Sequence, residues 1–277
     1  MIDLERILVL GGSGMVGSQI PFGVKPSHAE LDITDAESVA RGFDTYKPVA
    51  LLHLAGLIDV KRCEEEPEHA QRANIFGTRN VAQAAAKAGV PVIYLSTCMV
   101  FSGSKSSPYV ETDIPDPLTV YGKTKRSGEE EILDVPRSLV VRTGWLFGGF
   151  DRDVKFVKRF IDTLKAGTPI RATSDRVGSP TYVPDLIKEI VRLMQEGKEG
   201  IFHVVNDGVA SYLQVAEILK ELTHSHSGVT GLSQAELNPS ELPRGLMEGL
   251  VSKRSIMLRS YKEALADYVA ALIEKGK

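Results

Sequence analysis

The stretch RILVLGGSGMVG, residues Arg6–Gly17, decides the fold of this chain. It starts as an apolar run, which predicts a buried strand, and ends in the spaced glycines Gly11, Gly14 and Gly17, which predict a tight turn. Glycines at this spacing after a strand let the backbone approach a pyrophosphate, and a helix that begins there presents its N-terminus to the phosphate charge. A turn without a ligand is the alternative, but the position directly after the first predicted strand favours phosphate binding.

Strand and helix patterns alternate along most of the chain. Buried strands are predicted at residues 6–12, 48–56, 90–97, 137–148 and 200–206, and helices at 35–47, 66–89, 120–133, 154–167, 183–197, 211–222 and 260–275. This order predicts an α/β fold, a doubly wound, mostly parallel Rossmann-like sheet with helices on both faces. The alternation weakens after Gly148, and residues 222–255 show no strong period. We therefore expect a dinucleotide-binding core in residues 1–148, to which later elements return, and mainly a small substrate-binding lobe in residues 149–277.

Composition narrows the class of protein. The 277 residues are 43% hydrophobic and 25% charged, as in ordinary soluble globular proteins, and the net charge of −3 argues against nucleic acid or an anionic membrane as the main partner. The longest apolar runs fall far short of the ~20 residues that span a bilayer. The N-terminus carries acids before a short apolar run and no basic leader. With only Cys63 and Cys98 present, we expect a reducing, cytoplasmic location.

A second pattern places Tyr121 and Lys125 one turn apart on one face of a predicted helix. A free phenol has a pKa of ~10, and a neighbouring ammonium stabilises the phenolate and lowers that pKa, which makes a tyrosine usable as a general acid. The third predicted strand ends in Ser96 and Thr97, at the sheet edge where ligands bind. The Tyr–Lys spacing alone is common on exposed helices. The combination of the glycine turn, the strand-end hydroxyls and this pair, in this order along the chain, is much more specific than any one of these features alone.

With these features together, the chain resembles the extended short-chain dehydrogenases/reductases, and among them the dTDP-4-dehydrorhamnose reductases. The resemblance covers nearly the whole chain. Its most diagnostic pieces are PYVETDIPDPLTVYGKTK at residues 108–125 and GSPT at residues 178–181. It implies an NADPH- or NADH-dependent reduction of the 4-keto group of a nucleotide-linked deoxysugar, and it permits a homodimer.

The resemblance also implies roles for individual residues. Thr97, Tyr121 and Lys125 would form a catalytic triad, in which Tyr121 gives a proton to the sugar C4 oxygen as hydride arrives from the nicotinamide. Lys125 would lower the Tyr121 pKa and hold the nicotinamide ribose, and Thr97 would hydrogen-bond the carbonyl. The substrate would meet Thr97, Met99 and Trp145. The cofactor would be bound by Tyr121 and Lys125 together with Gly11, Ser13, Gly14, Met15, Val16, Gly17, Asp32, Ile33, Leu54, Ala55 and Gly56. No residue spacing favours a metal site.

The chain departs from the family pattern near the expected substrate pocket. Cys98 and Met99 stand where the family usually has Asp-Tyr, so a tyrosine hydroxyl is lost from the pocket. Ile58 and Lys61 stand where the family often has a threonine and an acid. Losing a hydroxyl changes which polar group of a substrate can be satisfied. These changes argue for a different sugar or a lost activity, and neutral change at a pocket rim is the alternative.

The first strand–helix–strand unit is too short. Only 14 residues separate Gly17 from Asp32, whereas a complete unit takes ~30, and Pro21 interrupts any helix. Asp32, by count, could be the acid that holds a ribose hydroxyl. However, the strand end, helix and strand after it match the segment that follows the third strand in the resembling family. Asp32 and Ile33 therefore correspond to its adenine contact, and the second strand is expected to be deleted or displaced.

This shortening leaves the choice of cofactor open, because the second strand carries the residue that separates NAD from NADP. Lys25 is the basic residue noted nearby, and it hints at NADP. Two further functions stay open. A related sugar epimerase, or a reductase of another carbonyl, would use the same triad. A non-catalytic nucleotide-binding or regulatory subunit is favoured by the shortened unit and by Met99, and opposed by the triad.

Overall fold

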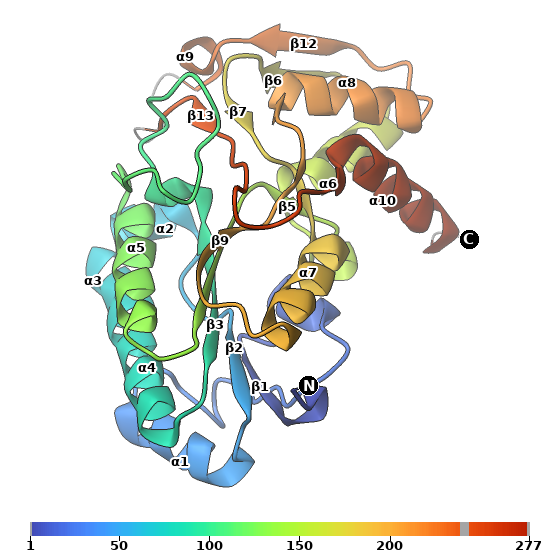
Figure 1. The fold of residues 1–277 in the computed structure, drawn as a ribbon. Coiled ribbons are helices and arrows are strands. Elements are labelled where there is room, and N and C mark those ends of the chain that lie inside the picture. The colour runs from blue at the N-terminus through green and yellow to red at the C-terminus, as the bar shows by residue number, and fades with distance from the viewer. Residues whose placement is uncertain (1, 239–243, 276–277) are drawn as a thin grey trace. The chain divides into compact units, whose positions relative to one another are not determined.

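The computed structural model describes residues 2–238 and 244–275, which form two compact units (Figure 1). The first unit is built from the residues up to Ser102, Ile114–Arg142 and Ile187–Phe202. The second is built from Gly103–Asp113, Thr143–Leu186 and the residues from His203 onward. Within the described residues, no helix combines the length and apolar character needed to cross a bilayer.

A five-stranded sheet forms the centre of the first unit. Its strands lie in the order β1 (Ile7–Leu10), β2 (Ala50–His53), β3 (Val92–Thr97), β4 (Leu139–Thr143) and β9 (Gly200–His203). The pairs β1–β2 and β2–β3 are parallel. All residues of β1, β2 and β4 are buried, as expected for a sheet covered on both faces. The predicted α/β fold with a mostly parallel, Rossmann-like sheet is confirmed.

The first crossover is reduced to a single turn. After η1 (Leu4–Arg6) and β1, the chain forms only the 3₁₀ turn η2 (Gly17–Gln19) and returns to β1 at Val24. The Val24 amide donates to the Ile7 carbonyl, and the Val9 amide donates to the Val24 carbonyl, both at 2.8 Å. The expected second strand is therefore a one-residue bridge beside β1. The predicted shortening is confirmed, but the helix N-terminus expected to face a phosphate is not formed, because the turn ends at Ile20, before Pro21.

Helices cover the sheet of the first unit. They are α1 (Ala36–Tyr46), α2 (Val60–Glu65), α3 (Pro67–Gln71), the π-helical turn η3 (Arg72–Phe76), α4 (Gly77–Ala88) and α5 (Val120–Leu133). Asp35 caps α1, because its carboxylate accepts from the Glu37 amide. The helix predicted at 66–89 is divided into α3, η3 and α4, and it stops at the predicted Gly89, whose φ is +66°. Side chains of β1, β2, β3, α1, α4 and α5 share one apolar core.

The second unit joins short strands to longer helices. Its pairs are β5 (Leu146–Phe147) with β8 (Thr181–Tyr182), β6 (Ile170–Thr173) with β12 (Val229–Leu232), and β10 (Asn206–Asp207) with β14 (Leu258–Ser260). A small sheet joins β11 (Ala210–Ser211), β7 (Val177–Gly178) and β13 (Met247–Glu248). Its other elements are η5 (Phe150–Arg152), α6 (Phe156–Lys165), α8 (Tyr212–Leu222), α9 (Gln234–Leu237) and α10 (Tyr261–Lys275). The turn η4 (Cys98–Val100) belongs to the first unit, and α7 (Val183–Gln195) starts in the second unit and continues in the first. The stretch 222–255, which has no strong period, contains β12, α9 and β13, and its residues 239–243 lie outside the described part.

Candidate active site

The start of α5 sets the position of Tyr121. Thr119 caps this helix, because its hydroxyl oxygen accepts from the Gly122 amide at 3.1 Å. A Cβ built on Gly122 would lie 2.2 Å from the Met99 carbonyl oxygen, so only glycine lets the helix approach η4 this closely. Since η4 directly follows Thr97, the end of β3 and the start of α5 meet. The Thr97 side chain lies close enough to the Tyr121 phenol to influence its pKa.

The pKa of Tyr121 determines whether its phenol carries a proton at neutral pH. Burial raises the pKa of its phenol, and the Thr97 side chain acts in the opposite direction without cancelling that effect. Tyr121 is therefore protonated at neutral pH and can serve as an acid. The expected lowering of the Tyr121 pKa by Lys125 is not the dominant effect in this geometry, because the Lys125 ammonium lies over another ring.

Lys125 is a buried cation. Its side chain is 4% exposed, and its Nζ lies 3.8 Å from the centre of the Tyr94 ring, in a cation–π contact. Burial lowers the pKa of Lys125 to about 7, and the charge of Glu129 opposes this shift. The buried His53 on β2 is neutral, because burial, followed by the charge of Lys125, lowers its pKa to about 3. Lys125 thus titrates near neutrality, where its charge can respond to its surroundings.

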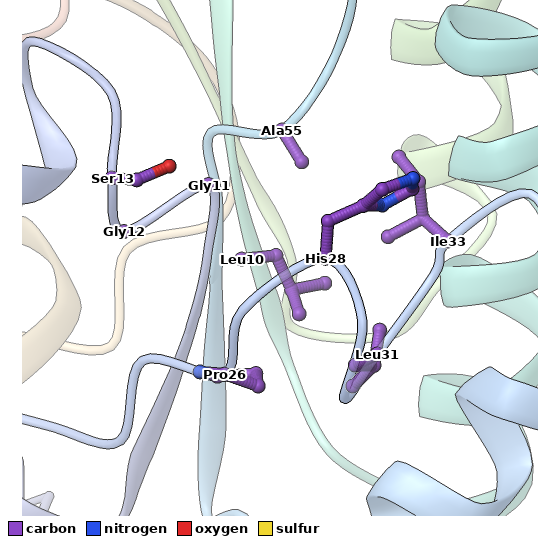
Figure 2. Close-up of a pocket in the computed structure, with 9 residues that line it drawn as sticks. All are labelled: Leu10, Gly11, Gly12, Ser13, Pro26, His28, Leu31, Ile33 and Ala55. Carbon is purple, nitrogen blue, oxygen red and sulfur yellow. The ribbon is translucent and has the colours of Figure 1, made fainter.

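A cavity in the first unit lies beside the glycine turn (Figure 2). It encloses about 420 Å³ together with its open mouth. Its lining residues are Leu10, Gly11, Gly12, Ser13, Pro26, His28, Leu31, Ile33 and Ala55. Gly11 has a φ of +83°, and a Cβ there would lie 2.7 Å from the Ala55 nitrogen. The turn after β1 and the loop after β2 therefore approach each other closely only because residue 11 is glycine.

The predicted cofactor residues fall into two groups. Gly11, Ser13, Ile33 and Ala55 line the cavity. The others continue the glycine turn (Gly14, Met15, Val16 and Gly17), flank Ala55 (Leu54 and Gly56) or precede Ile33 (Asp32). The Asp32 carboxylate accepts from the amide and the hydroxyl of Thr34, both at 2.8 Å, so it stabilises a turn. The Asp32 backbone also helps to hold this turn, since its amide donates to the Ser38 hydroxyl.

Sequence reasoning missed His28, and the structure gives Lys25 a partner within the protein. The Lys25 ammonium donates to the Ile20 carbonyl, and its methylene groups pack against Gly12, where a Cβ would lie 2.7 Å from the Lys25 Cβ. The hint toward NADP that rested on Lys25 therefore has no support. The side chain of His28 lines the cavity instead (Figure 2). Its Nε2 lies 3.8 Å from the Asp32 carboxylate. The sequence signal that could have identified His28 was its position in the short segment between the glycine turn and Asp32.

The predicted substrate residues lie in different units. Met99, in η4, donates its amide to the Thr97 hydroxyl at 3.2 Å. Trp145 belongs to the second unit. Its indole donates to the Glu248 carboxylate at 2.6 Å and packs on the Tyr212 ring, with centroids 4.1 Å apart. A Cβ on Gly178, in the GSPT stretch, would lie 2.1 Å from the indole, so this glycine makes room for Trp145.

The fold is that of an extended short-chain dehydrogenase/reductase. The chain belongs to the RmlD substrate binding domain family, which matches residues 5–273, and the resemblance noted in the sequence is confirmed.

Individual relatives align over nearly the whole chain. A spore coat polysaccharide biosynthesis protein of Bacillus subtilis, SpsK, is 30% identical over 96% of this chain and 97% of its own. A dTDP-4-dehydrorhamnose reductase of Mycolicibacterium smegmatis is 32% identical over 97% of this chain and 86% of its own. The crystal structure of dTDP-4-dehydrorhamnose reductase from Bacillus anthracis in complex with NADP has a TM-score of 0.90 at 27% identity, and covers 97% of this chain and 100% of its own.

Proposed function

We propose that this protein reduces the 4-keto group of a nucleotide-linked deoxysugar with NADPH or NADH, as a reductase of the dTDP-4-dehydrorhamnose type. The observation that carries the proposal is the half-buried, protonated Tyr121, which lies near Thr97 at the carboxyl end of β3, with Lys125 one helical turn away. The relatives named as dTDP-4-dehydrorhamnose reductases support the substrate class.

Tyr121 acts as the general acid in this proposal. Its hydroxyl gives a proton to the carbonyl oxygen, so that the keto group becomes an alcohol, and solvent then reprotonates the phenolate. A positioned acid of this kind contributes roughly 10²–10⁴-fold to the rate. Thr97 holds the phenol and the substrate oxygen in place, and Lys125 holds the nicotinamide ribose of the cofactor.

We place the dinucleotide at the cavity beside the glycine turn. Gly11 lets the turn after β1 approach the loop after β2, and Ile33 and Ala55, which line the cavity, offer apolar contacts to an adenine. The bound cofactor would supply the hydride that reduces the carbonyl carbon. We assign residues 1–148 mainly to cofactor binding and residues 149–277 mainly to binding of the sugar nucleotide. Met99 and Trp145, which come from the first of these ranges, are also assigned as contacts of the sugar nucleotide.

The test is a pair of measurements on the purified protein. Calorimetry with NADPH and with NADH measures binding, and the loss of absorbance at 340 nm with a dTDP-4-keto-6-deoxysugar measures reduction. The proposal predicts binding of at least one reduced cofactor and turnover of the keto sugar. Cofactor binding without turnover of any keto sugar would favour the regulatory subunit, for which the reduced first crossover is the supporting observation. An epimerised keto product without net oxidation of the cofactor would favour the epimerase.

We also propose a cytoplasmic location and a homodimer. Support for the location is that Cys63 and Cys98 are both buried free thiols, as in proteins of reducing compartments. Light scattering on the eluting protein tests the dimer, and fractionation of the source cells tests the location.

A further inference from the structure

A buried ion pair lies one helical turn beyond Lys125. Glu129 on α5 and Arg142 on β4 are 0% and 1% exposed. Arg142 donates to both carboxylate oxygens of Glu129, from Nε at 2.8 Å and from Nη2 at 2.7 Å. The Ser96 hydroxyl donates to the same carboxylate at 2.5 Å, and Arg126 donates to it at 3.1 Å. Because desolvation of two charges offsets most of their attraction, such a pair is weak evidence for a stabilising role and calls for another explanation.

The ion pair is connected to the candidate triad through two elements. Ser96 directly precedes Thr97 on β3, and Glu129 follows Lys125 by one turn on the same face of α5. Tyr94 and Ser96 share one face of β3, since side chains alternate along a strand. On that face Tyr94 lies under the Lys125 ammonium and Ser96 bonds Glu129. Helix α5 and strand β3 are therefore joined at two points beside Thr97.

The surroundings of Lys125 contain one nearby negative charge. From β3, the Tyr94 ring presents its face to the ammonium. From β2, His53 is neutral. On α5 itself, Tyr121 is protonated and Glu129 is ionised, with its pKa held low chiefly by Arg142, against the effect of burial. Among the described residues, Glu129 is the group whose charge favours the ammonium form of Lys125.

We propose that Glu129 is a positioning residue of this site: its carboxylate, fixed by Arg142 and Ser96, keeps Lys125 charged and holds the end of β3 against α5. The proposal rests on the proposed function for its catalytic meaning. The titration of Lys125 can nevertheless be measured without substrate, cofactor or turnover.

The experiment follows the Lys125 side chain by ¹H–¹³C NMR on protein labelled with [¹³Cε]-lysine, with the signal assigned by its loss in Lys125→Met. Glu129→Gln removes the charge but leaves Arg142 buried and unpaired, so the main variant is Glu129→Gln/Arg142→Met, which removes both charges and keeps an acceptor for Ser96. The matched control is Glu130→Gln, because Glu130 is 59% exposed on the same helix and pairs with Arg126.

We expect a midpoint of about 7 for Lys125 in the unchanged protein, a midpoint lower by about one pH unit or more in the double variant, and no shift in the control. An unshifted midpoint in a double variant that keeps its circular dichroism and its cooperative unfolding would overturn the proposal, as would an equal shift in Glu130→Gln. A failure of the unchanged protein to reduce any keto sugar would instead count against the proposed function.

Discussion

A Cβ on Gly122 would lie 2.2 Å from the carbonyl oxygen of Met99, and this approach brings Tyr121 to the end of β3. In an open helical position, Gly→Ala stabilises a helix by roughly 1 kcal/mol. At Gly122 we expect the opposite sign, because α5 must move away from η4. Gly122→Ala should lower both the melting temperature and kcat, measured by calorimetry and by NADPH oxidation. Ser127→Ala on the same helix is the control, and equal behaviour of the two variants would contradict this explanation.

Lys125 reduces the stability of the fold that it serves. Its pKa of about 7 in the native protein lies below its value of 10.5 in the unfolded chain, so the native state binds this proton less tightly. Between pH 7 and pH 10.5 only the unfolded chain holds the proton on Lys125, so the free energy of unfolding rises with pH in this range. Below pH 7 the buried lysine is charged, and its burial lowers the free energy of unfolding by the full amount. Lys125→Met should stabilise the protein at neutral pH by a few kcal/mol and abolish turnover.

The same titration predicts the pH dependence of catalysis. In the unchanged protein, kcat/KM for the reduced cofactor should fall as pH rises through about 7, because the Lys125 cation is lost. Steady-state kinetics at several pH values measure this dependence of kcat/KM. Urea unfolding at the same pH values measures the free energy of unfolding predicted above. If Lys125→Met melted at a lower temperature than the unchanged protein at pH 7, the prediction that this substitution stabilises the fold would be contradicted.

The glycine turn predicts a graded effect on cofactor binding. Gly11 combines a φ of +83° with a Cβ position 2.7 Å from the Ala55 nitrogen, so Gly11→Ala should weaken NADPH binding at least tenfold. Gly14 has a milder contact, 3.3 Å from the Gly11 carbonyl oxygen, and Gly14→Ala should cost less. Calorimetric titration with NADPH measures both, and a larger loss in Gly14→Ala would contradict the assignment of the cavity.

The choice between NADPH and NADH should depend on His28 rather than on Lys25. Lys25→Met should leave the ratio of the two dissociation constants unchanged, because its ammonium is bonded to the Ile20 carbonyl outside the cavity lining. His28→Ala should change that ratio, because the imidazole lines the cavity. Binding of both cofactors to each variant is compared by calorimetry. A changed ratio in Lys25→Met alone would return the selection of cofactor to that residue.

Local sequence predicted the elements whose ends carry their own signals. Helix α5 begins at the predicted residue because Thr119 caps it, and α4 stops at Gly89 because a glycine takes the left-handed conformation there. The division of the helix predicted at 66–89 was missed, since a π-helical turn leaves no periodic signal. The two-residue strands of the second unit were missed for a related reason, because their pairing depends on distant partners.

The candidate site was predictable where spacing along one element defined it. Tyr121 and Lys125 share a helix face, and Thr97 follows from the strand end. The contacts made across elements were not predictable: Glu129 finds Arg142 on β4, and Lys25 finds the Ile20 carbonyl rather than a ligand. These pairings depend on how the chain packs, so a single sequence does not contain a pattern for them.

The most direct test of the central claim is turnover of a dTDP-4-keto-6-deoxysugar by Tyr121→Phe, with NADPH binding measured on the same sample. Removing only the hydroxyl should leave the NADPH dissociation constant within about threefold, and should lower kcat by roughly 10²–10⁴-fold, because the general acid is lost. An unchanged kcat in this variant would contradict the assignment of Tyr121 as the proton donor.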